Sequence, residues 1–154
     1  MIISKNCIDL VKHFEGLYLK AYRCPNGVMT LGFGTTLYPN DEAIKEDDTC
    51  TKDQAEQWLT NDLLTVEQWL NLRGLHLTQN QFDAVASFVY NLGPSQYIHS
   101  TLYRKMKVNP DDSSIAEEFI KWHHVGGKDL KGLKFRRMTE SHLYYTGILK
   151  FEWE

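Results

Sequence analysis

A single strongly apolar segment, residues 78–92, sets the tightest limit on how this chain of 154 residues can fold. Thr78 and Gln81 have the spacing of a helix capping box, and Gly93-Pro94 marks the end of the helix. Its apolar residues recur at helical spacing: Phe82, Val85, Ala86, Phe88, Val89 and Leu92. Because so apolar a helix must be enclosed by other elements, we predict that it lies buried at the centre of the molecule.

Helix patterns come before and after this segment. Ser4 caps a first helix that Gly16 ends, and Thr51 caps a long one that Gly74 ends. Three more helices are predicted after the central one: a short one from Ser100 to before Asn109-Pro110, one that begins at Ser113 or Ser114, carries Trp122 and is broken by Gly126-Gly127, and a last one over about 132–145.

Residues 17–36 follow a different pattern. Strand-forming residues recur on both sides of Pro25-Asn26-Gly27, a strong turn signal, and predict a β-hairpin. Gly32 and Gly34 suggest a sharp bend or a close backbone approach. Residues 37–50 are polar and acidic and predict a loop. The predicted fold class is therefore α+β, mostly α, with one small hairpin near the N-terminus.

Composition excludes several kinds of protein. Apolar residues make up 42% of the chain and charged residues 24%, the balance of a folded globular protein. A net charge of −3 lacks the positive excess typical of nucleic-acid binding. Three cysteines without metal-ligand spacing predict no metal, no cofactor and a reducing compartment. The N-terminus has no apolar run of the length of a signal peptide or membrane helix, so we expect no membrane insertion.

Three side chains could carry chemistry together. Glu15 lies at the junction of the first helix and the hairpin, where partial desolvation would favour the protonated carboxyl group that a general acid needs. Cys24 and Thr30 flank the hairpin turn and could face that junction. Glycoside hydrolysis needs an acid on one side of the scissile bond and a base, nucleophile or water-holding group on the other. Taken alone, Glu15 is better explained as an exposed glutamate at a helix end.

Residues 14–36 resemble the start of phage-type lysozymes, the endolysins of glycoside hydrolase family 24. That family has Glu, eight residues, Asp or sometimes Cys, five residues and Thr, and Glu15, Cys24 and Thr30 fit this spacing. Residues 77–93 are similar to the family's central helix. A third set of residues resembles the C-terminal signature of the family: Trp122, Gly126-Gly127, Gly132-Leu133, Arg136-Arg137 and Glu140. The resemblance spans about 3–145, and three pieces in the right order are specific where one would not be.

The resemblance implies one lysozyme-like, two-lobed domain over 1–154, with the first helix over 4–15, a hairpin lobe over about 17–50 and a helical lobe over about 51–147. It implies hydrolysis of the β-1,4 bond between N-acetylmuramic acid and N-acetylglucosamine in peptidoglycan, with inversion. Glu15 would protonate the leaving oxygen, while Cys24 and Thr30 would position and activate a water. Arg136 or Arg137 would pair with Glu15 or a nearby helix. Further candidates for substrate contacts, each of which could equally be structural, are Gly32, Gly34, Gln81 and Asn91.

Some questions stay open at this point. Cys24 stands where the family usually has Asp, so it could be a base, a covalent nucleophile that would give retention, or a water contact. Two other functions are alternatives to a lysozyme: a cysteine peptidase with His13 as base, and a wall-binding protein that does not cut.

By analogy with endolysins, a monomer would wait in the host cytoplasm until a pore-former releases it to the wall. His123-His124, predicted on a helix where adjacent side chains diverge by about 100°, is expected to be solvated and not to bind metal.

Overall fold

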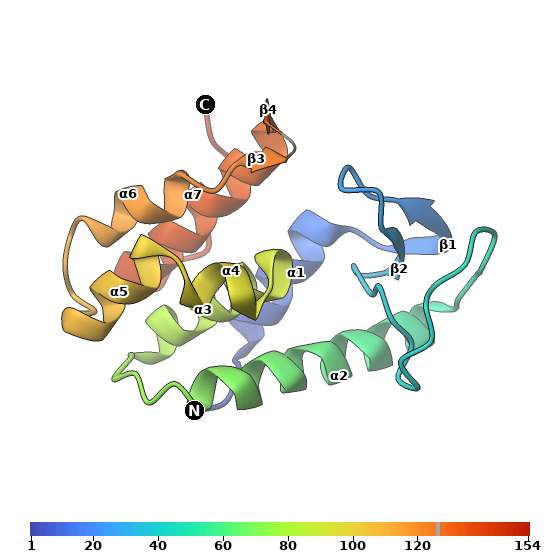
Figure 1. The fold of residues 1–154 in the computed structure, drawn as a ribbon, viewed down its shortest axis with the longest axis horizontal. Coiled ribbons are helices and arrows are strands. Elements are labelled where there is room, and N and C mark those ends of the chain that lie inside the picture. Colours follow the sequence, from blue (N-terminus) through green and yellow to red (C-terminus); the bar gives the residue numbers. More distant parts are fainter. Residues whose placement is uncertain (126) are drawn as a thin grey trace.

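The computed structural model describes residues 1–125 and 127–154 (Figure 1), so the Gly126 part of the predicted Gly126-Gly127 break lies outside the described residues. Seven helices and two small antiparallel sheets form this described part. The helices are α1 (Lys5–Glu15), α2 (Lys52–Asn71), α3 (Gln79–Leu92), α4 (Pro94–Ile98), α5 (Thr101–Val108), α6 (Ile115–Ile120) and α7 (Lys131–Thr146), and the strands are β1 (Tyr18–Arg23), β2 (Met29–Gly32), β3 (His124–Val125) and β4 (Lys128–Asp129). The α+β, mostly helical fold class is confirmed.

The central helix is α3, as the sequence predicts. It packs against α1, α2, α4 and α7, and all its residues from 81 to 89 are buried. The predicted capping box begins it and Gly93 ends it. Phe88 is fully buried, and its ring meets the rings of Tyr97, Phe119 and Trp122 edge-on. The apolar core is therefore built around α3, because this helix has apolar surface facing several neighbours at once.

The predicted β-hairpin follows α1 directly. Gly16, with a φ of 70°, ends α1 by donating its N–H to Lys12 O at 2.9 Å. β1 and β2 pair with Tyr22 opposite Thr30. Between them, Gly27 N donates to Cys24 O at 2.8 Å, and Gly27 has the positive φ (85°) of a turn closed by glycine. The hairpin lies at one end of the molecule (Figure 1), and α2 contacts both β2 and α3. A single long helix thus connects the hairpin end to the helical body.

The structure corrects three details of the sequence prediction. Pro94 was expected only to end the central helix, yet it occupies the first turn of α4, where its missing N–H costs nothing. The helix expected to reach Trp122 ends at Ile120, and the segment after it forms the β3–β4 hairpin. His123 and His124 therefore follow α6 and do not lie on a helix. α2 ends at Asn71, before Gly74.

Among the described residues, none of the helices has the length and apolar character that crossing a membrane requires.

Candidate active site

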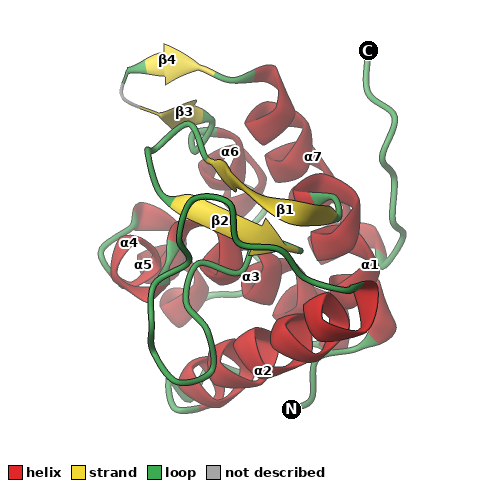
Figure 2. Cartoon of the chain, turned by 90° about the vertical axis from the view of Figure 1, so that its right-hand side faces the viewer, coloured by secondary structure: helices red, strands yellow, loops and turns green. Residues whose placement is uncertain are grey.

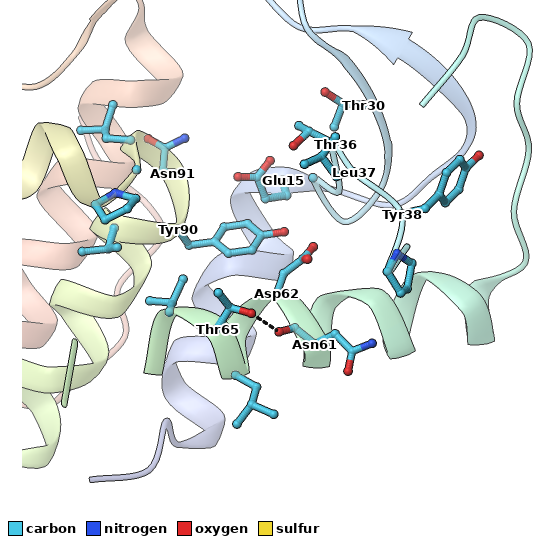
Figure 3. A pocket seen from close by; sticks show the side chains of 18 of the residues that line it. Glu15, Thr30, Thr36, Leu37, Tyr38, Asn61, Asp62, Thr65, Tyr90 and Asn91 are labelled. Carbon is cyan, nitrogen blue, oxygen red and sulfur yellow. Dashed lines mark hydrogen bonds between the residues drawn. The ribbon is translucent and has the colours of Figure 1, made fainter. Parts of the chain in front are cut away.

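A cleft of about 750 Å³ separates the hairpin and the loop after it from the helical body. Glu15, Asp62 and Asn91 reach it from α1, α2 and α3, while Cys24 and Thr30 reach it from the hairpin. Figure 3 shows Glu15 near the middle of this space, with Tyr90 and Asn91 on one side and Thr30 on the other. The structure thus brings the three side chains that the sequence singled out for chemistry to one cleft.

Glu15 is held from two sides. The Nη1 of Arg136 donates to its Oε1 at 2.7 Å, and the Glu15 side chain is only 15% exposed. On the other side, a Cβ added to Gly34 would lie 2.7 Å from Oε2. Gly34 also has a φ of 89°, which favours glycine. The backbone of the loop can therefore approach the carboxyl group only because residue 34 has no side chain.

Arg136 is itself part of a buried polar network. Its Nε contacts Glu140 Oε1 at 3.4 Å, and its Nη2 donates to Ser87 O and Oγ at 3.3 Å. Arg137 contacts Glu140 at 2.9 Å and donates to Asn91 Oδ1 at 2.8 Å. Burial by itself would lower the pKa of Arg136, but the Glu15 and Glu140 carboxylates outweigh it and the net shift is upward. Arg136 is therefore the arginine that pairs with Glu15, a choice the sequence had left open.

Cys24 and Thr30 contact each other across the base of the turn. The Cys24 Sγ lies 3.0 Å from Thr30 Oγ1, and that hydroxyl donates to Val28 O at 3.1 Å. Because the carbonyl can only accept, it takes the hydroxyl hydrogen, so the thiol is the donor to Thr30. Thr30 is nearly fully buried and Cys24 is partly buried. The sulfur is thus oriented by its neighbour.

Asp62 is a cleft residue that the sequence reading missed. It accepts a hydrogen bond from Thr35 Oγ1 at 2.9 Å. Burial raises the pKa of Asp62 from 3.8 to about 6, and the bond from Thr35 only partly opposes this. Nearby, Tyr90 donates to Phe33 O at 2.7 Å, and burial raises the pKa of its hydroxyl well above the usual range. The sequence does contain a signal for Asp62. Its carboxyl group shares an otherwise apolar helix face with Leu59, Leu63 and Val66, a position where an acidic residue is unusual.

Four further residues had been candidates for substrate contacts. Gly34 and Asn91 line the cleft, whereas Gly32 and Gln81 are absent from its described lining. Gly32 packs against α2, where an added Cβ would lie 3.0 Å from Ala55 Cβ. The Gln81 side chain accepts from Thr78 N and donates to Asp111 Oδ1 at 3.0 Å. Gly32 and Gln81 are therefore occupied by packing and capping in this structure.

Among the described residues, no group of three potential metal ligands meets in this cleft. Its described lining offers three carboxyl groups, from Glu15, Asp41 and Asp62, and the Cys24 thiol. The described residues bring three potential ligand atoms together only at the β3–β4 hairpin. The carboxyl groups and the thiol of the lining are groups that can transfer protons or bind water.

Comparison with known proteins gives a consistent picture. The model of the family described as Phage lysozyme matches residues 12–140. An endolysin of Acyrthosiphon pisum secondary endosymbiont phage 1 is 41% identical over 149 residues, which cover 94% of this chain and 98% of the relative. The endolysin of Salmonella phage P22 is 34% identical over 145 residues, with coverage of 94% and 98%.

Two solved structures have a similar fold. The endolysin from Escherichia coli O157:H7 phage FAHEc1 gives a TM-score of 0.84 at 32% identity, with 97% of each chain covered. The muramidase domain of SpmX from Asticaccaulis excentricus gives 0.78 at 30% identity, covering 94% of this chain and 98% of that one. The similarity therefore extends over nearly the whole chain in both sequence and structure.

The raised pKa of Asp62 predicts that Asp62→Asn stabilises the protein near pH 7. The folded state prefers the protonated form of the Asp62 carboxyl group. This preference therefore stabilises the fold fully below pH 3.8, and the stabilisation is lost as the pH rises through about 6. Asparagine never ionises and can still accept from Thr35. Allowing for the partial exposure of the group, we expect a gain on the order of 1 kcal/mol in unfolding free energy, measured by urea unfolding at about pH 7.

Asp48→Asn is the matched control. Hydrogen bonds from the Tyr38 hydroxyl and the Lys45 backbone N–H lower the pKa of Asp48, so the same substitution there should destabilise the protein at neutral pH. For Asp62→Asn, a gain of the same size at about pH 3 would contradict the prediction.

Proposed function

The chain belongs to the phage lysozyme family, and from this premise we propose that it is an endolysin, a glycoside hydrolase that lyses bacteria by cleaving peptidoglycan. The bond cleaved is the β-1,4 linkage between N-acetylmuramic acid and N-acetylglucosamine. The observation that carries the proposal is the cleft in which Glu15, bound by Arg136, shares one space with the Cys24–Thr30 pair.

Glu15 is the proposed general acid. Arg136 donates to Oε1, and no described residue donates to Oε2. We therefore assign the transferable proton to Oε2, from which it passes to the leaving glycosidic oxygen as the bond to the anomeric carbon breaks. The ion pair with Arg136 holds the carboxyl group in one orientation and stabilises the carboxylate that the proton transfer leaves.

Cys24 and Thr30 are proposed to hold the attacking water. The Thr30 hydroxyl donates its hydrogen to Val28 O, and one of its two lone pairs accepts from the Cys24 thiol. The second lone pair of Thr30 Oγ1 is therefore free to accept a hydrogen of the water. The sulfur can accept the second hydrogen weakly. A water that attacks the face opposite the leaving group gives inversion, which we propose as the stereochemical outcome. As its oxygen bonds to the anomeric carbon, this water releases one proton to the solvent that enters the open cleft. In this scheme Cys24 orients the water and forms no bond to the sugar.

A peptidase mechanism has less support. Histidine is absent from the described lining of the cleft. The ring of His13, the base considered from the sequence, stacks on Phe151 with centroids 4.0 Å apart. Product analysis on purified walls separates the two activities, since a muramidase releases reducing sugar ends and a peptidase releases free amines.

Residues 1–154 are proposed to work as one domain and one monomer, made in the host cytoplasm and acting on the cell wall after a separate pore-former releases it. Sedimentation of the purified chain tests the monomer. Lysis of cells only when the inner membrane is opened tests the release route.

Glu15→Gln is predicted to lower wall lysis by roughly 10²–10⁴-fold, the loss typical when a general acid is removed, because the amide cannot give up that proton. The amide oxygen can still accept from Arg136, so the variant should melt cooperatively. Clearing of purified walls measures the activity. Glu56→Gln, which removes the partner of Lys12, is the control and should lyse normally. Substantial lysis by Glu15→Gln would rule out the acid role.

Cys24→Asp is predicted to keep activity, because a carboxylate can hold and activate the same water. Cys24→Ala should lose roughly a hundredfold or more. Cys50 is partly buried like Cys24 but lies outside the described cleft lining, so Cys50→Ala serves as the thiol control. Full activity of Cys24→Ala would show that this thiol plays no part, and a product of retained configuration would point to a covalent intermediate.

Gly34→Ala is predicted to lower activity on the order of a hundredfold, because the new methyl group would displace the Glu15 carboxyl group. Gly74→Ala introduces a side chain at a similar positive φ (66°) with no neighbour within 4 Å. It therefore reproduces the backbone strain without the contact. Equal activity losses in the two variants would mean that strain alone accounts for the effect.

A further inference from the structure

The β3–β4 hairpin brings together three side chains of the kinds that bind transition metals. His124 pairs with Asp129 across the two strands, and Leu130 N donates to His123 O at 2.9 Å. His123 Nδ1 and Asp129 Oδ1 are 2.8 Å apart, and the two imidazole rings lie with centroids 4.1 Å apart. Figure 2 shows this hairpin at the opposite side of the molecule from α2. His123, His124 and Asp129 are all absent from the described lining of the cleft that holds Glu15.

We propose that His123, His124 and Asp129 bind one divalent transition-metal ion, with Zn²⁺ as the best match. One ligand atom from each of the three residues lies within 4.8 Å of the other two. On a helix, adjacent histidines would diverge. Here α6 ends before them and β3 begins only at His124, and the ligand atoms of both rings lie near that of Asp129. The proposal does not depend on the glycosidase activity.

The distances suit a small ion. Ligands at about 2.0–2.2 Å from a tetrahedral zinc ion lie roughly 3.3 Å from one another. The three atoms must therefore approach one another by at most about 1.5 Å. Side-chain rotation can supply this, because the Asp129 side chain is 63% exposed and His124 is exposed. Two imidazoles and one carboxylate favour zinc, copper or nickel over magnesium or calcium. Exposure leaves the fourth position to water.

Charge around the site is mixed. Lys134, one turn into α7, acts on Asp129 electrostatically and opposes a cation there. Its removal should therefore strengthen binding without touching a ligand. Binding would fix the end of α6 to the start of α7, the helix that carries Arg136. The metal would thus act as a clip on the connection before that helix.

Isothermal titration calorimetry of the full, untagged chain with ZnCl₂ tests the site. We expect one ion per chain, at least a tenfold weaker affinity in His124→Asn and in Asp129→Asn, and equal or tighter binding in Lys134→Gln. His99→Asn replaces an exposed histidine that bonds to Ser95 O, and should bind as the wild type does. MgCl₂ should give no binding.

Thermal melting supplies a second readout. Zn²⁺ should raise the melting temperature of the wild type and of His99→Asn but not of His124→Asn, since an ion that binds the folded state stabilises it. Absence of zinc binding, unchanged affinity in both ligand variants, or half an ion per chain together with dimer formation would each overturn the proposed site. His124 is exposed, so loss of the fold in its variant is not expected, and metal-free melting verifies this.

Discussion

The contacts of the buried Arg136 guanidinium join the helices that surround the cleft. Starting from α7, the guanidinium reaches Glu15 at the end of α1 and Ser87 on α3, and its own helix adds Glu140. A buried charge is tolerated only where carboxylates and hydrogen-bond acceptors surround it. Glu140, together with Glu15 once it has given up its proton, balances the charges of Arg136 and Arg137. Three helices are thereby joined at the edge of the cleft.

The same network carries over into the proposed chemistry. Glu15 is positioned by a residue 121 positions away and by the backbone of Gly34, so helical body and hairpin both contribute to its orientation. Asp62 lies in the same cleft with a carboxyl group that burial disfavours and a single hydroxyl donor supports. Such a group lowers stability near neutrality, a cost commonly found where a site must present polar groups to a substrate.

The opposite side of the cleft is built from short-range contacts. The turn of the first hairpin aligns Cys24 with Thr30, and the Val28 carbonyl decides which of the two is the donor. A thiol held in this way can orient a water, and the proposed mechanism requires no more of Cys24 than that. The hairpin sets the partner of Cys24, α1 carries Glu15, and Gly16 links these two elements.

Local patterns in the sequence determined the central helix, its capping box, the end of α1 at Gly16 and the turn before Gly27, because each depends on residues within a few positions of one another. They also carried the resemblance that led to Glu15, Cys24 and Thr30. Tertiary structure alone decided the rest. Arg136 and Arg137 are equivalent in sequence, but one helical step separates their directions and only Arg136 reaches Glu15. Local patterns mark Asp62 and Gly34, but their partners, Thr35 and Glu15, come from other segments of the chain. The two histidines come together with Asp129 through a hairpin that the sequence did not predict.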